Sequence, residues 1–114
     1  MPNARLLMCT CPDAPTAAAI ARALVDERLA ACVSRLPGLV SVYRWEDTIE
    51  ETQEHLLLIK TTAAAVEPLI ARLQALHPYE VPEIIALDIL QGLPGYLEWI
   101  ADNVAVSIMP PARS

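Results

Sequence analysis

One segment of this chain is longer than the globule that the remaining residues can form. Residues 48–62 follow a plausible turn at Glu46-Asp47 and become strongly apolar at residues 56–59. As a single strand these fifteen residues would extend about 50 Å, at roughly 3.3 Å each. A globule of this chain length has a radius of gyration near ~13 Å, hence a diameter of roughly 35 Å. The predicted hairpin therefore projects beyond its own domain, although residues 50–55 are polar enough to be partly loop.

Hydrophobic periodicity predicts the other elements. Alternating or continuous apolar runs indicate strands, and 3–4 spacing indicates helices. Asp13 is a suitable N-cap for the first helix, and Pro78 ends the second helix before His77. The predicted strands are 5–11, 29–35, 40–45, 48–62, 84–90 and 104–109, and Pro37-Gly38 is expected to break or bulge the second of them. The predicted helices are 14–28, 66–76 and a short one that begins at Pro94.

This order of elements predicts an α+β fold. Strand-helix-strand occurs twice and is followed by a helical addition, which is the ferredoxin-like split β-α-β sandwich with a long hairpin between its second and third strands and an extra C-terminal helix. We expect one domain over residues 1–114, with a core of about 5–108 and a frayed tail at 109–114. Two helices cover only one face of such a sheet. A ring of identical subunits would cover the other face and the strand edges.

Composition excludes several classes of function. The formal charge of −6 and the single lysine, Lys60, argue against nucleic-acid binding, which needs clustered basic residues. No apolar run approaches the roughly 18 residues of a membrane helix, and the N-terminal residues do not read as a secretory signal. Three cysteines, an odd number, fit free thiols in a reducing cytoplasm. A hydrophobic content of 54% favours a surface that is covered by another subunit.

The segment 77–84, His-Pro-Tyr-Glu-Val-Pro-Glu-Ile, carries most of the chemical information. Its two prolines bias His77 and Val81 toward extended backbone, so the segment is stiff. It presents an imidazole, a phenol and two carboxylates in nearly fixed order. We interpret it as a pre-organised recognition element.

Together with this segment, several others resemble one known family, the CutA divalent-cation-tolerance proteins. The matching pieces are Cys11-Pro12-Asp13, residues 29–33, residues 41–45 with Ile49-Glu50, residues 58–61, residues 77–84, and Gly92 with residues 96–100. Their order and spacing agree from about residue 6 to 101. The resemblance implies a cytoplasmic homotrimer of ferredoxin-like subunits, similar in architecture to the PII signalling proteins. It also implies a role in tolerance of divalent cations, chiefly copper.

The resemblance also implies candidate metal ligands. Cys9 and His77 align with positions proposed in the family to bind copper, and thiolate and imidazole suit copper in either oxidation state. Glu80 and Glu83 are expected to add oxygen ligands, or to form hydrogen bonds across a subunit boundary. This chain has Leu76 before His77 where some members have a second histidine, and Cys11 where many have no thiol.

Other interpretations remain open for these residues. Cys9 could be a small buried core residue, and Cys9 and Cys11 share a strand face but would need local bending to chelate an ion. Met8 could complete a site. Cys32 is expected in the core, and Glu54 with its acidic neighbours at a solvated hairpin tip.

The alternative to metal binding is a PII-like regulatory module. In it, a cleft around Trp45, Lys60, Tyr79 and Glu80 would bind a small ligand between subunits, and the hairpin would relay the bound state. A trimeric scaffold for partner proteins is a further possibility. An enzyme is not expected, because no activated nucleophile accompanies the carboxylates. We expect the partners to be copies of the chain and metal ions, with copper first, and no nucleic acid or membrane.

Overall fold

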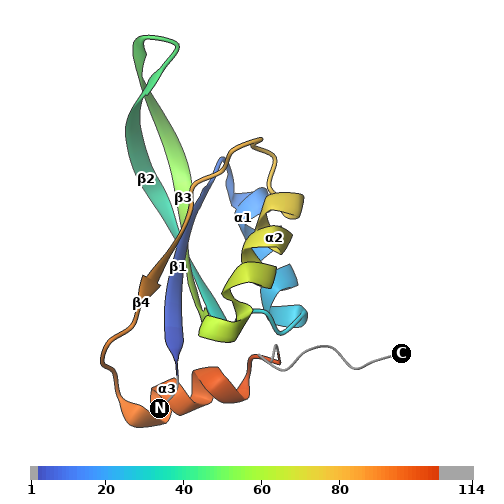
Figure 1. Ribbon diagram of the computed structural model, residues 1–114. Coiled ribbons are helices and arrows are strands. Elements are labelled where there is room, and N and C mark those ends of the chain that lie inside the picture. Colours follow the sequence, from blue (N-terminus) through green and yellow to red (C-terminus); the bar gives the residue numbers. More distant parts are fainter. Residues whose placement is uncertain (1–2, 106–114) are drawn as a thin grey trace.

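The computed structural model of the protein describes residues 3–105 (Figure 1). Its elements are β1 (Ala4–Cys11), α1 (Ala14–Asp26), β2 (Cys32–Trp45), β3 (Thr48–Thr62), a 3-10 turn (Ala63–Ala65), α2 (Val66–Leu76), β4 (Ile84–Asp88) and α3 (Pro94–Asp102). Every predicted element up to α3 is present. Of the strand predicted at 104–109, residues 104 and 105 form no strand, and the rest, like the predicted tail at 109–114, lies outside the described residues.

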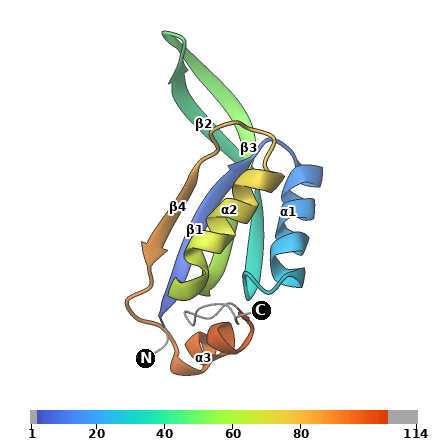
Figure 2. The same cartoon turned by 45° about the vertical axis from the view of Figure 1, so that its right-hand side comes forward.

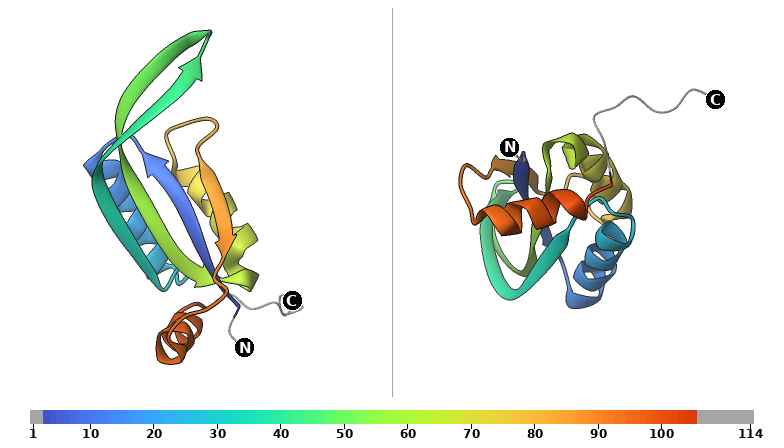
Figure 3. Two further views of the ribbon diagram at one scale, coloured as in Figure 1. Left: turned by 90° about the vertical axis from the view of Figure 1, so that its left-hand side faces the viewer. Right: turned by 90° about the horizontal axis from the view of Figure 1, so that it is seen from below.

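The four strands form one antiparallel sheet in the order β2-β3-β1-β4. This order confirms the predicted ferredoxin-like arrangement, in which the first strand lies between the third and the fourth. Helices α1 and α2 cover one face of the sheet, and α3 crosses below the end of the sheet where β1 begins (Figures 1 and 2). Seen from the opposite face and from below, no helix of residues 3–105 lies along the strands on the second face (Figure 3).

The core lies between the sheet and α1 and α2. Alternate residues of β1, among them Leu7 and Cys9, point toward the helices and pair with Ile59 and Leu57 of β3. The helices contribute the apolar positions that the 3–4 spacing predicted, which are Ala17, Ile20, Leu24, Leu69 and Leu73. A smaller cluster of Ala4, Ala31 and Ile100 fixes α3 to the sheet.

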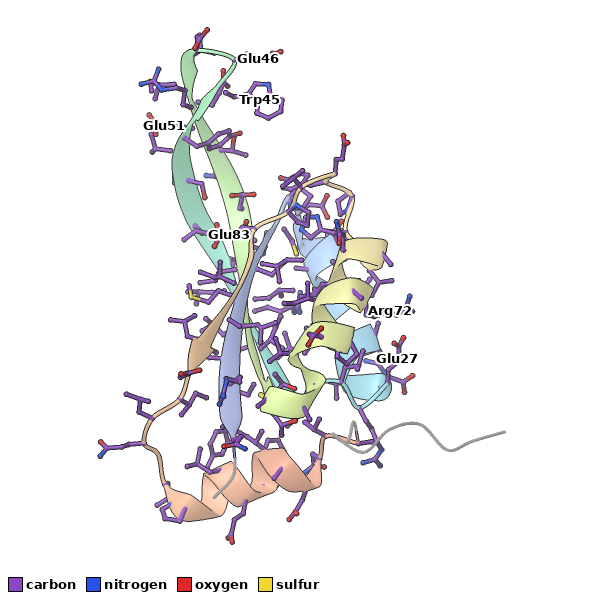
Figure 4. The ribbon with its side chains drawn as sticks, in the orientation of Figure 1. Glu27, Trp45, Glu46, Glu51, Arg72 and Glu83 are labelled. Atoms are coloured by element: carbon purple, nitrogen blue, oxygen red, sulfur yellow. The ribbon has the colours of Figure 1, made fainter. Side chains whose placement is uncertain are left out.

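The first helix begins where the sequence predicted and ends two residues early. Asp13 is the N-cap, and its Oδ1 accepts a 2.8 Å hydrogen bond from the backbone N–H of Thr16. The helix ends at Asp26 because Arg28 adopts a left-handed conformation with φ 59°, which a helix interior excludes. Near this end, Arg72 of α2 donates two hydrogen bonds to Glu27 and ties the two helices together on the outside of the molecule (Figure 4).

The β2–β3 hairpin extends beyond the rest of the molecule, as predicted. Its strands stay paired up to Trp45 and Thr48, and Glu46 and Asp47 form the turn with φ of 48° and 66°. Residues 50–55 are strand throughout, so the projection is not shortened by a loop. The molecule measures 47 × 38 × 24 Å with a radius of gyration of 15.2 Å, larger than the roughly 13 Å of an ordinary globule of this length. Trp45 and Glu46 mark the far end in Figure 4.

The sheet face opposite the helices is apolar and partly exposed. Leu36 of β2 and Ile85 and Leu87 of β4 keep 53%, 49% and 42% of their surface exposed. Trp45 and Ile49 are further exposed apolar residues, on opposite faces of the hairpin near its turn. Among residues 3–105, no helix is both long enough and apolar enough to cross a membrane.

Candidate metal site

Three potential metal ligands meet at the end of β1. The Sγ atoms of Cys9 and Cys11 and a ring nitrogen of His77 all lie within 4.8 Å of one another. Both cysteines are fully buried, and His77 is 7% exposed. Cys9 and His77 were predicted as ligands from the sequence, and the structure brings them together with Cys11, which was not among the predicted ligands.

Two local features of the sequence create this cluster. In β1 the residues two apart face the same side, so Cys9 and Cys11 both point toward the helices. Helix α2 ends at Leu76 because Pro78 forces His77 out of helical geometry, and His77 has φ −81° and ψ 138°. The chain then returns across the end of β1 toward β4. The stiff segment predicted from the two prolines therefore carries His77 onto the cysteines.

Both nitrogens of His77 are used by the fold. Nε2 lies 2.7 Å from the carbonyl oxygen of Thr10, and the backbone N–H of Tyr79 donates to Nδ1 at 3.1 Å. A carbonyl only accepts and an amide N–H only donates, so the ring is held as the neutral tautomer with its proton on Nε2. The β1–β4 ladder reaches only to the pair of Cys9 and Ile84, and His77 bonds the next carbonyl of β1.

The two thiols differ in acidity. Interaction with the Cys11 side chain, followed by burial, raises the pKa of the Cys9 thiol above its ordinary value. The same interaction with Cys9 lowers the pKa of Cys11, against the effect of burial. Cys9 Sγ also donates to the Thr10 carbonyl at 3.8 Å. The Cys11 sulfur is therefore the one that more readily carries negative charge.

Two carboxylates surround the cluster. The charges of Glu83 and Glu54 both contribute to raising the pKa of Cys9. Glu83 lies exposed where the chain enters β4 (Figure 4), whereas Glu54 is only 7% exposed and accepts a 3.2 Å hydrogen bond from the Tyr79 hydroxyl. Burial and the neighbouring Glu54 raise the pKa of Tyr79 to about 12. The negative charge of the two carboxylates, Glu54 and Glu83, favours a cation at the thiols.

Two expectations were wrong. Glu54 is not part of a solvated tip, because the segment after His77 folds over the base of the hairpin and covers it. Cys32 is only partly buried, because it pairs with Lys60 on the sheet face opposite α1 and α2. Cys9 and Cys11 approach His77 within a regular β1 ladder.

The four predicted cleft residues do not meet within one chain. Trp45 lies at the hairpin turn, and Tyr79 and the exposed Glu80 lie near the cluster. Lys60 lies six residues along β3 from Glu54, which is about 20 Å. There its ammonium donates to Ser34 Oγ at 2.6 Å and approaches Cys32 Sγ at 3.8 Å.

The cluster suits a soft metal ion. In a tetrahedral site with metal–sulfur bonds of about 2.3 Å, sulfur atoms lie ~3.8 Å apart, and in a linear one about 4.6 Å, both within the observed limit. Thiolate and imidazole donors select copper or zinc over magnesium or calcium. Met8 does not complete the set, because its neighbours in β1 take the helix side and Met8 takes the other face.

The sequence does contain one indication that Cys11 belongs to the site. Its spacing from Cys9 put the two thiols on one face, but nothing local placed His77 beside them. That contact spans 67 residues, the separation between Thr10 and His77, and depends on how β4 pairs with β1. Glu54 carried no signal, since its neighbours in sequence are polar.

Comparison with known proteins gives consistent matches over nearly the whole chain. A family described as CutA1 divalent ion tolerance protein matches residues 5–103. The divalent-cation tolerance protein CutA of Thermus thermophilus is 52% identical over 98 residues, covering 86% of this chain and 95% of that protein. Protein CutA of Mus musculus is 48% identical over 91 residues, 80% of this chain but only 51% of that protein. The crystal structure of CutA from Xylella fastidiosa has a TM-score of 0.89 and 55% identity over 90% of this chain and 99% of that one.

Proposed function

Because the chain belongs to the CutA1 divalent ion tolerance protein family, we propose that it acts in divalent-cation tolerance by binding copper, or another thiophilic metal, in the cluster that contains Cys9, Cys11 and His77. The observation that supports this most directly is the convergence of two thiols and an imidazole within 4.8 Å in a buried cluster. Glu83 would add negative charge beside the ion, and Glu80 remains a predicted outer ligand. The proposed role is binding, and it includes no catalytic step.

We further propose that the working form is a cytoplasmic homotrimer. The apolar sheet face and the projecting hairpin both need cover, and identical subunits would supply it. Relatives are named from other compartments, as a chloroplastic protein of Arabidopsis thaliana and a periplasmic protein of Archaeoglobus fulgidus. Three unpaired cysteines favour a reducing compartment for this chain. We expect no nucleic acid or membrane among its partners.

Titration of the reduced protein with copper tests the metal-binding role. We expect one site per chain, and the Cys9→Ser variant to bind at least about tenfold more weakly, the lower end of the loss seen even for outer-shell partners. Cys32→Ser is the matched control, because its thiol lies on the other face of the sheet. A wild-type protein that binds no copper, or Cys9→Ser binding equal to wild type, would overturn the proposal.

A PII-like regulatory role is the second candidate, favoured by the position of Lys60. Its ammonium is held on the uncovered sheet face by Ser34, and neither of the two ion pairs among residues 3–105 includes it. A second subunit on that face would place this charge in a cleft suited to a small anion, with Trp45, Tyr79 and Glu80 supplied along the boundary. Thermal-shift screening with nucleotides and small anions tests this. No shift from an intact trimer would count against it.

A further inference from the structure

Binding a metal would require His77 to give up hydrogen bonds that hold its ring, whereas the two cysteines already lie side by side on one face of β1. We propose that Cys9 and Cys11 form a two-thiolate site for Cu(I), and that His77 remains bonded to Thr10 outside the coordination sphere. This inference rests on the proposed metal-binding role and assigns the donors and the ion. Its central residue is Cys11, at a position for which the sequence predicted no ligand.

The geometry of β1 supports a two-sulfur site. Both side chains point to the same face and are fully buried, with their sulfurs within 4.8 Å of each other. Linear coordination by two bonds of about 2.3 Å needs sulfurs about 4.6 Å apart. Cys9 is paired with β3 and β4, and Cys11 with β3, so the strand holds the thiols in place before an ion arrives.

The Thr10 carbonyl explains why His77 would stay where it is. This buried carbonyl accepts hydrogen bonds from Cys9 Sγ and from His77 Nε2. A thiol that binds a metal loses its proton, so Cys9 can then no longer donate to Thr10. His77 becomes the remaining side-chain donor, and moving its ring would also break the bond from the Tyr79 N–H. Buried polar groups without partners are costly, which favours an imidazole that does not move.

The small number of ligand atoms that are free to bind a metal favours Cu(I) over Zn(II). Zn(II) sites in proteins are almost always four-coordinate. Within residues 3–105 the cluster contains only Cys9, Cys11 and His77, and the nitrogens of His77 are engaged. The nearby Glu54 already accepts the Tyr79 hydroxyl. Cu(I) is soft, favours thiolates and is satisfied by two donors, so it fits the site better than Zn(II).

Cu(I) competition under anaerobic, reducing conditions tests the assignment. A chromogenic Cu(I) chelator competes with the full chain, and Zn(II) is titrated separately. We expect one Cu(I) per chain. Cys11→Ser should bind more weakly by more than the ~10–100-fold that loss of an outer-shell partner costs. Cys32→Ser should match wild type, and His77→Gln, whose amide can donate to Thr10 and accept from Tyr79, should stay within about tenfold. Copper X-ray absorption should show sulfur neighbours without imidazole scattering.

The outcomes separate this inference from the role on which it rests. Cu(I) affinity that survives Cys11→Ser, disappears in His77→Gln, or gives imidazole scattering would overturn the two-thiolate site and leave metal binding intact. Absence of binding for copper and Zn(II) by wild type would overturn both. Cys11→Ala is measured beside Cys11→Ser, and circular dichroism confirms folding, so that a loss of binding cannot come from unfolding of one variant.

Discussion

At the residue scale, His77 connects three parts of the fold. Its ring bonds β1 through Thr10, bonds its own segment through Tyr79, and packs against the Tyr79 ring at 4.8 Å between centroids. Tyr79 in turn reaches Glu54 at the base of the hairpin. A residue predicted only as a metal ligand therefore also closes the end of the sheet, and its substitution has a structural effect without any metal.

This structural role gives a stability prediction. His77→Phe fills the space but leaves the Thr10 carbonyl with only the weak Cys9 thiol donor and the Tyr79 N–H without its partner, so we expect the free energy of unfolding to fall by about 1–3 kcal/mol. Chemical denaturation of metal-free protein at fixed concentration measures it. His77→Gln keeps a donor and an acceptor and should lose clearly less. Equal losses in the two variants would show that the hydrogen bonds are not what matters.

Residue-level reasoning from sequence succeeded where the determining contacts are local. Asp13 as a helix cap and Pro78 as a helix stop act within one turn, and both were predicted. The partners of Cys11 and the burial of Glu54 both depend on residues 77–79. This segment is more than twenty residues from Glu54 in sequence and more than sixty from Cys11. Side-chain type alone does not encode those distances.

At the element scale, the projecting hairpin depends on an irregularity in β2. The pairing with β3 shifts register between Leu36 and Leu39, and Gly38 has φ 80° there. The sequence predicted that Pro37-Gly38 breaks or bulges the strand, and the strand continues through it as a bulge. A bulge adds twist and bends the strand, which directs the outer half of the hairpin away from the domain.

The left-handed glycine at this bulge makes a prediction. Gly38→Ala meets no atom within 4 Å, so its cost is that of the backbone conformation alone, about 1–2 kcal/mol of unfolding free energy. Gly95 also has open space for a Cβ but lies within α3, so Gly95→Ala should stabilise by up to about 1 kcal/mol. Thermal or urea unfolding of both variants measures the two signs. A stabilising Gly38→Ala would contradict the importance of its conformation.

The order of elements was predictable because each has a strong local pattern, and element ends were less so. Helix α1 stops at Asp26 rather than Arg28, since Leu29 and Ala30 turn their N–H groups back to the Leu24 carbonyl and lead the chain into β2. Strand β4 stops at Asp88, which pairs with Arg5 at 3.0 Å. These ends are set by packing that no short window of sequence contains.

At the scale of the whole molecule, the elongated shape and the exposed apolar surface both indicate contact with another protein chain. The extents of 47 × 38 × 24 Å describe an elongated body, and Leu36, Ile85 and Leu87 lie exposed on one sheet face. A water-exposed apolar patch of this kind is typical of a surface that meets another protein. The radius of gyration exceeds that of a compact globule because one ribbon leaves the body.

We expect sedimentation at low micromolar concentration to give a mass three times that of the 12.4 kDa chain. Leu36→Glu places a charge on the uncovered face and should shift the protein toward smaller species, because burying that charge in an interface is costly. Ala19→Glu, on the exposed side of α1, is the control and should sediment as wild type. A well-folded wild-type monomer would contradict the trimer and remove the walls of the PII-like cleft.

The position of β1 in the sheet has a consequence during synthesis. This strand leaves the ribosome before the other three, yet its neighbours are β3, where Ala4 pairs with Thr62, and β4, which begins at Ile84. The nascent chain must carry an unpaired apolar strand until both partners have been made, while β2 and β3, adjacent in sequence, can already pair. The interval before residue 84 emerges is therefore when a growing chain is most exposed to aggregation, and when a holding chaperone would help most.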